Sequence, residues 1–292
     1  MVGIIDDKCY SVFSYQGCFG TISSIRKYNA NKDIAMKTIK VDGKKIELFD
    51  SIEDLPILRF HKFNKMLLVD AGVGSDLADF DRHIERAIIY ASGDTPKMAV
   101  KELQNLRQNV YLIQSEVSPR CMAFAALVKS IDGVEYNDMS DDGLQKVINI
   151  IGNVSHNKMT GYLNSVKKKI DDDLRLYFPS LFEDATLKEY YDRLKDRTVK
   201  VLKTVIAGKA TDEERKEISD ITSELITYFR PQEYDGSEGV EVKQDRQFEN
   251  MCLVLSQNLH VDAKKFTVLE YYNAFEYVKE QNKKAMRQAK AK

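Results

Sequence analysis

Tryptophan is absent from this sequence of 292 residues, and proline and cysteine are scarce, with five and four copies. Few prolines suit a helical chain with short connections, because proline interrupts helices. The cysteines are Cys9, Cys18, Cys121 and Cys252, and their spacing matches no zinc motif. Cys121 and Cys252 sit among apolar residues. We therefore expect free thiols in a reducing compartment and no disulfide framework.

Long apolar runs and an excess of one charge are also missing. No run approaches the roughly 18 apolar residues of a transmembrane helix. The opening stretch MVGIIDDKCY has early acids and no apolar segment, so we predict no secretion signal. A net charge of -1 gives no overall attraction to nucleic acid or to anionic membranes. With 43% hydrophobic residues, the chain can bury a core as one large or two medium domains.

Residues 1–50 differ in composition from the rest of the chain. They are rich in β-branched and aromatic residues, with glycine at the bends. The pair Asp42-Gly43 lies between two such runs, which is typical of a β-hairpin turn. We predict two to four strands here. Because so few strands cannot form an independent sheet core, they must lie on helices or on another chain.

From Ser51 onward the apolar period is helical. The pattern predicts helices over about 55–69, 76–92, 94–116, 119–131, 140–151, 158–178, 186–207, 211–229, 242–259 and 267–284. Residues 131–136 suggest a short hairpin or an extended turn. The expected fold class is mainly α: a multi-helix bundle with a small N-terminal β-hairpin or strand segment. The expected domains are a β-rich segment (1–50), a helical body (51–230), a loop (231–241) and C-terminal helices with a basic tail (242–292).

The stretch AGVGSD at 71–76 raises the question of a phosphate-binding loop. Such a loop needs a preceding strand and a following lysine, whereas this one follows a helical pattern and has no such lysine. A helix joint accounts for each residue: Gly72 ends one helix, Gly74 lets the chain reverse, and Ser75 or Asp76 caps the next. We favour the joint and keep an anion site as the alternative.

Candidate metal and catalytic residues are sparse. None of the four histidines has a second His or Cys at helical spacing, and His83 could pair with Asp79 on the surface. Carboxylate runs such as 171–173 point in different directions on a helix, so we interpret them as solvated faces. We find no catalytic constellation, and we expect no enzyme activity, cofactor, metal or small-molecule substrate.

Aromatic and basic side chains provide the candidate contact residues. A possible partner interface comprises Tyr271, Tyr272, Phe275, Tyr277, Tyr190 and Tyr191. Tyrosine suits protein contacts because it buries area and keeps a polar tip, but core packing is the interpretation that we favour for these residues. Possible anion or nucleic-acid contacts are Lys283, Lys284, Arg287 and Lys290. For that tail, we favour a frayed, solvated helix end and keep these contacts as the less expected alternative.

Three blocks carry a resemblance to a known group of proteins: DSIEDLPILRFHKFNKMLLVDAGVGSDLADFDRHIERAIIY, ELQNLRQNVYLIQSEVSPRCMAFAALVKSIDGVEYNDMS and FENMCLVLSQNLHVDAKKFTVLEYYNAFEYV. They resemble uncharacterised virion or assembly proteins of tailed bacteriophages, and most closely those of crAss-like podoviruses of gut Bacteroides. The resemblance spans roughly residues 40–285 and supplies no catalytic residues. It implies a structural role in the particle, its neck or its tail.

Four functions follow from these observations. The first is a phage virion structural protein, such as a neck or tail ring component, that contacts copies of itself or other virion proteins. It would be located in the virion and assembled in the host cytoplasm. The second is a tail assembly chaperone that binds helical partner segments and is absent from the mature particle. The third is a nucleic-acid binder acting through the basic tail, and the fourth is an enzyme. We expect the first and keep the others as alternatives.

Overall fold

The computed structural model of the chain describes residues 37–41, 43–69, 77–114, 118–152, 156–182, 185–228 and 230–290. Contacts divide the chain into two units. Unit 1 comprises Met1–Lys62, Phe124–Phe182 and Met251–Lys292, and unit 2 comprises Phe63–Ala123 and Glu183–Asn250. This grouping is discontinuous in sequence, unlike the sequential domains expected from composition. Of the loop expected at 231–241, residues 231–239 form no helix or strand, whereas residues 240 and 241 already belong to α9 (Val240–Leu259).

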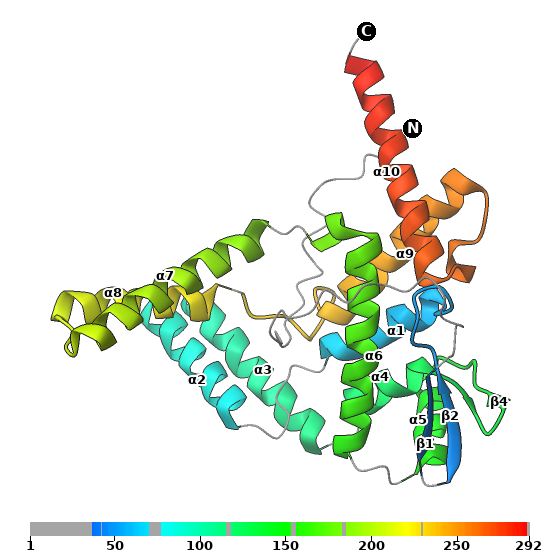
Figure 1. Cartoon of the computed structure of the whole chain (residues 1–292), viewed down its shortest axis with the longest axis horizontal. Coiled ribbons are helices and arrows are strands. Elements are labelled where there is room, and N and C mark those ends of the chain that lie inside the picture. Colours follow the sequence, from blue (N-terminus) through cyan, green and yellow to red (C-terminus); the bar gives the residue numbers. More distant parts are fainter. Residues whose placement is uncertain are drawn as a thin grey trace. The chain divides into compact units, whose positions relative to one another are not determined.

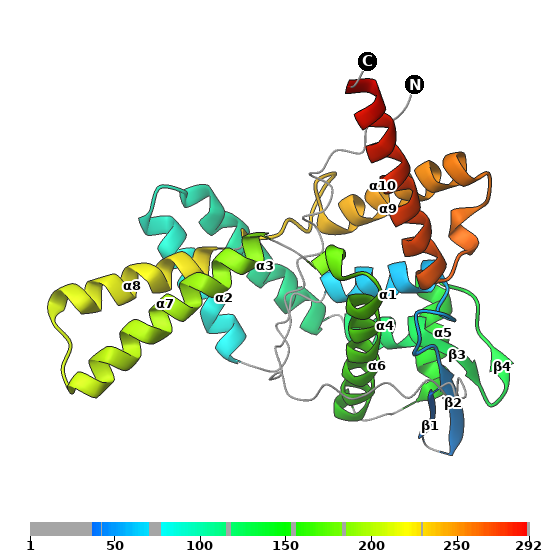
Figure 2. The ribbon, with the colours of Figure 1, turned by 45° about the horizontal axis from the view of Figure 1, so that its top comes forward.

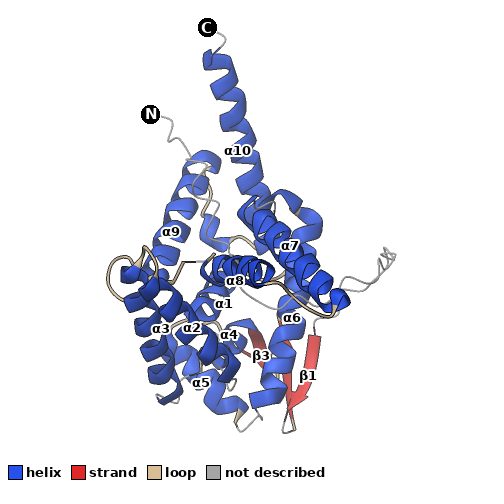
Figure 3. Cartoon of the chain, turned by 90° about the vertical axis from the view of Figure 1, so that its left-hand side faces the viewer, coloured by secondary structure: helices blue, strands red, loops and turns tan. Residues whose placement is uncertain are grey.

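The mainly α class is confirmed (Figure 3). The described strands are β1 (Lys37–Val41), β2 (Lys44–Leu48), β3 (Val128–Ile131) and β4 (Val134–Glu135). The described helices are α1 (Ile57–Val69), α2 (Leu77–Ser92), α3 (Pro96–Gln114), α4 (Pro119–Leu127), α5 (Asp141–Ile151), α6 (His156–Tyr177), η2 (Pro179–Phe182), α7 (Ala185–Ala207), α8 (Asp212–Thr227), α9 (Val240–Leu259), η3 (Ala263–Lys265) and α10 (Val268–Lys290). The strand expectations for residues 1–36 and the glycine joint at 72–76 lie outside the described residues.

The strands of unit 1 form one antiparallel sheet in the order β1-β2-β3-β4. The predicted hairpin joins β1 to β2, with Val41 opposite Lys44. The second turn joins β3 to β4 through Asp132 and Gly133, both with positive φ (50° and 84°). Tight hairpins require this combination, which an Asp-Gly pair adopts at low cost. Both turn signals in the sequence thus correspond to hairpins.

One expected helix is too long. The apolar run at 119–131 predicts helix throughout, yet α4 ends at Leu127 and the next residue begins β3. The cause is tertiary, because β2 offers a pairing edge on which Leu48 lies opposite Val128 and Ile46 opposite Ile131. The sheet therefore gains its third and fourth strands from the same chain, in addition to resting on helices.

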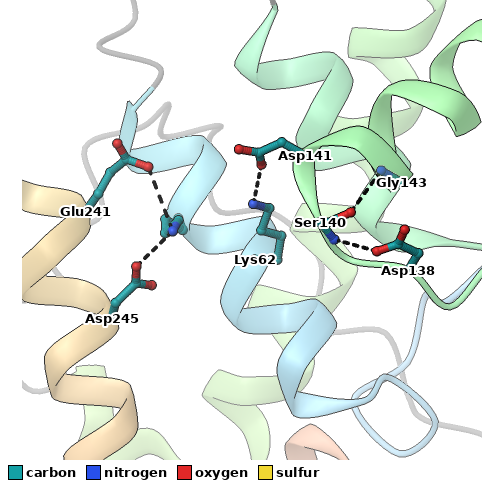
Figure 4. A network of polar contacts seen from close by, with 8 residues as sticks. Lys62, Asp138, Ser140, Asp141, Gly143, Glu241 and Asp245 are labelled. Atoms are coloured by element: carbon teal, nitrogen blue, oxygen red, sulfur yellow. Dashed lines mark hydrogen bonds and ion pairs between the residues drawn. The ribbon is translucent and has the colours of Figure 1, made fainter.

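Two polar clusters hold helix ends in place (Figure 4). Ser140 caps α5, since its Oγ accepts a hydrogen bond from the N–H of Gly143 at 3.1 Å. A Cβ at position 143 would lie only 2.4 Å from the Asp138 carboxyl carbon, so glycine permits this close approach. Within unit 1, Lys62 Nζ contacts Asp141 Oδ1 at 2.6 Å, which ties α1 to the first turn of α5.

The core of unit 1 collects apolar side chains from the sheet and from several helices. Its fully buried members include Ile46, Leu48, Leu55, Leu127, Leu144, Ile151, Leu163, Ile170, Leu255 and Val268. The chain entering α1 is also paired with the chain entering α10. The N–H of Val268 donates to Leu55 O and the N–H of Ile57 donates to Phe266 O, both at 2.9 Å. Segments more than 200 residues apart in sequence are thus joined by their backbones.

A buried arginine joins α1 to the junction between helix and sheet. Arg59 is 4% exposed. Its Nη1 donates to Ala126 O at 3.2 Å and to Val128 O at 2.8 Å. Its Nη2 donates to Asn137 Oδ1 at 3.0 Å and also to Tyr136 O. One planar guanidinium therefore donates to carbonyls at the end of α4, in β3 and after β4. The compact ammonium group of a lysine could not reach all of them.

The burial of Arg59 has an electrostatic cost that its surroundings offset. Desolvation lowers the pKa of the guanidinium, although arginine still remains charged in proteins. The ring of Phe49 lies 5.1 Å from the guanidinium carbon and supplies a cation–π contact. The carbonyls at the end of α4, in β3 and after β4 supply the remaining stabilisation. Hydrogen bonds from a charged donor are stronger than those between neutral groups.

We expect Arg59→Ala to lower the free energy of unfolding by about 3 kcal/mol, because it leaves buried carbonyls without donors. Lys168→Ala, which removes an exposed cation on α6 of the same unit, is the control and should change it little. Urea unfolding followed by far-UV circular dichroism measures both. Equal stability of the two variants would contradict the role given to Arg59.

Unit 2 is built from helices (Figure 1). Helices α2 and α3 form an antiparallel pair, α8 packs against α2, and α7 packs against α8. Ile221 and Leu225 are the buried residues of α8. The hydroxyl of Tyr90 on α2 donates to Thr227 O at 3.2 Å, next to that contact. The order of packing leaves α7 as the outer helix of a two-helix hairpin.

Candidate functional site

The hairpin of α7 and α8 has well-defined ends. Gly208, with φ of 70°, follows the last residue of α7. Thr211 then forms a capping box at the start of α8: its Oγ1 accepts from Glu214 N at 3.2 Å, and its own N–H donates to Glu214 Oε2 at 2.9 Å. The sequence expectation of helices ending at Gly208 and starting at Thr211 is confirmed. The short connection forces the two helices to run antiparallel.

Polar pairs hold α7 and α8 in register. Arg193 donates from Nε to Glu224 Oε1 at 2.8 Å and from Nη2 to Glu224 Oε2 at 2.5 Å. Lys200 Nζ lies 2.8 Å from Glu217 Oε2. These contacts raise the pKa of Arg193 and of Lys200 and lower the pKa of the Glu217 carboxyl, in each case chiefly through the hydrogen bond. All of these pairs lie on the side of α7 that faces α8.

The opposite side of α7 carries exposed apolar side chains. They are Val199, Leu202, Val205 and Ile206, which are 41%, 54%, 69% and 85% exposed, and we call them the α7 stripe. Positions 199, 202 and 206 fall on one helix face, since α-helical residues advance by about 100° each. Val205 widens the stripe on one side. Four adjacent exposed aliphatic residues on one face are unusual for a surface that stays in water.

Charged side chains flank the α7 stripe. Lys188 and Lys195 on α7 precede it and Lys203 lies beside it, all exposed. At the tip of the hairpin, the first turn of α8 holds Asp212, Glu213 and Glu214. An apolar centre with a charged rim is the composition of protein contact surfaces. Figure 2 shows the hairpin extending beyond α2 and α3 within unit 2.

Three of the predicted interface aromatics lie in the core of unit 1. Tyr271, Tyr272 and Phe275 are each 7% exposed or less. The ring of Tyr272 lies 5.5 Å from that of Phe178, and burial raises the pKa of both tyrosine hydroxyls. Core packing, the interpretation favoured from the sequence, therefore describes these three. The period of α10 turns them inward, and only Tyr277 of this group is exposed.

Tyr190 and Tyr191 lie on α7 and are half-buried. Their rings are 5.6 Å apart, and the ring of Tyr190 lies 5.5 Å from that of Tyr228 after α8. The hydroxyl of Tyr228 donates to Glu189 Oε2 at 3.1 Å. These aromatics thus close the base of the hairpin. The structure does not bring them together with Tyr271, Tyr272 and Phe275, since the two groups belong to different units.

The basic tail is helical. α10 runs to Lys290, beyond the expected end at residue 284, and its last turns extend past the other elements of unit 1 (Figures 1 and 3). Lys283, Lys284 and Arg287 are exposed on it, while the side chain of Lys290 lies outside the described part. Adjacent cations on a projecting helix can meet phosphates or carboxylates. These three residues therefore remain a predicted contact for anions.

A buried charge cluster joins α2 to α3 in unit 2. Glu102 is fully buried, and its Oε2 lies 2.7 Å from His83 Nδ1. Its Oε1 lies 2.8 Å from Arg86 Nε, but the direction does not suit a hydrogen bond, so we treat this contact as an ion pair. The expected partner of His83 was Asp79, whose side chain is outside the described residues. No local pattern in the sequence indicated that Glu102 would be the buried anion.

Removing the charge of Glu102 should destabilise unit 2. We expect Glu102→Gln to lower the free energy of unfolding by about 3 kcal/mol, because it removes the buried negative charge that pairs with His83 and with the Arg86 guanidinium. Glu85→Gln, an exposed change on α2, serves as the matched control. Hydrogen exchange of the α2 and α3 amides reports on this unit directly. Unchanged exchange in Glu102→Gln would refute the assignment.

The carboxylate run on α6 is not solvated throughout. Asp172 is exposed, whereas Asp173 is half-buried. Burial is the main cause that raises the pKa of the Asp173 carboxyl; Lys169 opposes the rise, and Asp172, Glu53 and Asp50 add to it. Lys169 is itself held by Asp50, with Nζ and Oδ2 2.7 Å apart. The expectation of a solvated face therefore fails at Asp173.

The raised pKa of Asp173 makes its ionised form unfavourable in the folded state. Above the folded pKa the full penalty applies, and below the unfolded value of 3.8 it is absent. We expect Asp173→Asn to be more stable than the wild type at neutral pH, by less than about 1 kcal/mol because the group is partly solvated. The advantage should shrink as pH falls through the folded pKa. A pH series of thermal unfolding, with Asp172→Asn as control, checks this; an advantage that grows in acid would contradict it.

The remaining surface offers an open hollow in unit 1 of about 500 Å³. Its lining includes Glu135, Asn137, Asp138, Lys146 and Asn149, which are exposed polar residues. Within the described ranges, no group of three His, Cys, Asp or Glu side chains is placed to hold a metal ion. In that same part of the chain, no helix has the length and apolar character needed to span a bilayer. Comparison with protein-family models, with curated proteins and with solved structures finds no match.

The α7 stripe is the site feature that sequence reasoning missed. The segment TVKVLKTVIA contains apolar residues on two faces of the helix, and only one face was needed for packing. Val201 lies on the side of α8, while Val199 and Ile206 lie on the opposite side. The signal available in the sequence was this second apolar face, on a helix whose other positions are largely charged. It indicates that one apolar face could be left uncovered. The sequence could not show which face would be covered.

Proposed function

We propose that this protein acts through protein–protein contacts, as a structural component of a tailed-phage particle such as a neck or tail ring. The particle role comes from the resemblance of residues 40–285 to phage virion and assembly proteins. The contact role has its own physical support in the α7 stripe. The protein would be located in the virion after assembly in the host cytoplasm, with other virion proteins or copies of itself as partners.

The observation that carries the contact role is the exposure of the α7 stripe. Burying a Val, Leu or Ile side chain is worth about 1.5–3 kcal/mol, so four of them provide a strong driving force for association. The hairpin that presents the stripe is fixed by its capping box and by the Arg193–Glu224 pair. A preorganised helix face loses little conformational freedom when a partner binds.

A tail assembly chaperone is the second candidate, because the same stripe suits an amphipathic helix of a partner. The two candidates differ in where the protein is found. A virion component stays in the finished particle, whereas a chaperone leaves before maturation. The nucleic-acid alternative depends on Lys283, Lys284 and Arg287 and predicts binding that weakens steeply with salt.

The test is the protein content of purified particles of the phage that encodes the chain, measured by quantitative mass spectrometry. We expect peptides of this protein at several copies per particle. A phage protein abundant in the lysate but known to stay outside particles serves as the control for carry-over. Abundance in the lysate together with absence from particles would overturn the structural role and favour the chaperone.

A further inference from the structure

We infer that the C-terminal end of α10 binds the phosphate backbone of double-stranded DNA. The contact residues are Lys283, Lys284 and Arg287, which we call the α10 cations. This site lies in unit 1, whereas the α7 stripe lies in unit 2, so it adds a second kind of partner to the protein contact proposed above. The inference rests on the charge, the exposure and the helical spacing of this segment, and it does not depend on the particle role.

The end of α10 carries cations without anions. Residues 283–292 contain five lysine or arginine residues and no aspartate or glutamate. Within the described residues, none of the α10 cations forms an ion pair or a hydrogen bond, whereas Lys279, one turn earlier, lies 3.5 Å from Glu276. The positive charge of this segment is therefore available to a partner outside the chain.

This part of the helix is also accessible from all sides. Every residue from 283 to 289 is exposed, so no described element covers it. Figures 1 and 3 show the same end of α10 extending past the other elements of unit 1. The described part of the tail is a regular helix up to Lys290. A helical row of cations loses less conformational freedom on binding than an unstructured tail would lose.

The helical register places the cations on one broad face. Lys283 and Arg287 are four residues apart and position 290 follows after three more, so the three positions lie within about 60° around the helix axis. Lys284 widens this face on one side. At a rise of about 1.5 Å per residue, the row from 283 to 290 is about 10 Å long.

The helix macrodipole does not account for all of these charges. Cations stabilise the partial negative charge at the C-terminus of a helix, but the effect falls off within the last turn. Arg287 lies in the last turn of α10, which ends at Lys290, whereas Lys283 and Lys284 lie before that turn. Helix propensity does not explain the charges either, because uncharged alanine and glutamine form helices about as well as lysine does.

The uncharged residues of the segment favour nucleic acid among the anionic partners. A helix that lies on a membrane needs large apolar side chains opposite its cations, and the centre of a protein interface is apolar and poor in lysine. Here the residues between and after the cations are Ala285, Met286, Gln288 and Ala289, which supply little apolar area. Nucleic acid binding needs no apolar centre, because phosphate contacts and the release of counterions supply the affinity.

Charge density favours a duplex over a single strand. Double-stranded DNA carries one charge per about 1.7 Å of its axis, against about 3.4 Å for one of its strands. A row of about 10 Å therefore faces about six phosphates of a duplex and about three of a single strand. Phosphate contacts position a protein on DNA without reading its sequence, so the binding is independent of base sequence.

The experiment measures the binding of the full-length chain to a labelled DNA duplex of about 30 base pairs by fluorescence anisotropy, over a series of salt concentrations. We expect affinity to fall as salt rises, with about -0.9 in the slope of log K against log salt for each phosphate contact. Lys283→Ala/Lys284→Ala/Arg287→Ala should lower the affinity at about 50 mM salt at least about 50-fold and make the slope shallower by about 2.7. Alanine preserves the helix, so the far-UV circular dichroism should stay unchanged.

The matched control is Lys146→Ala/Lys168→Ala/Lys265→Ala. It removes the same charge from three exposed lysines on other elements of unit 1, so it should lower the affinity less than about threefold. Lys283→Arg/Lys284→Arg keeps both charges and should bind as the wild type does. Equal losses in the control and in the α10 variant would overturn the inference, because net charge alone would then explain the binding.

Competition identifies the class of partner. Unlabelled duplex should displace the labelled duplex, whereas polyglutamate at the same charge concentration should not. Displacement by polyglutamate would overturn the assignment to DNA and favour an acidic protein surface. Binding of a single strand of the same length at equal or higher affinity would overturn the assignment to a duplex. A wild type that does not bind the duplex in about 50 mM salt would overturn the inference altogether. None of these results bears on the particle role, which is tested by the protein content of particles.

Discussion

The arrangement of unit 1 depends on the buried guanidinium of Arg59. Its donors reach carbonyls of α4, β3 and the loop after β4, which are the points where a helix turns directly into a strand. No loop separates α4 from β3, so the backbone groups at this junction need a partner from elsewhere. Arginine supplies several donors in one plane, and Phe49 stacks against it. Without this group, the sheet would lose the attachment of its second hairpin to α1.

Unit 2 combines one buried charge cluster with one exposed apolar helix face. Glu102 is fully buried between α2 and α3, paired with His83 and Arg86. By contrast, the α7 stripe presents aliphatic side chains on the outer side of the hairpin. A buried ion pair fixes one packing arrangement without adding much stability, whereas an exposed apolar face gains stability only on association. This contrast is what links the fold of unit 2 to a function in protein contacts.

The sequence contained reliable local signals and few non-local ones. Thr211 and Ser140 predicted helix starts, and the two Asp-Gly pairs predicted hairpins, because caps and tight turns depend on a few neighbouring residues. It could not show that residues 128–131 would leave a helical run to pair with β2, since that choice depends on an edge some 80 residues away. The same limit explains the candidate site. Tyr272 and Ile206 both fit an amphipathic stripe, but only packing decides that the first is buried and the second exposed.

Hydrogen exchange on α7 tests the account most directly. The amides around Val199, Leu202 and Ile206 should exchange more slowly in purified particles than in the isolated chain, because the account covers that face with a partner. Amides of α3 around Leu103 should exchange at similar rates in both samples. Equally fast exchange on α7 in both samples would contradict the claim that the stripe is a contact surface.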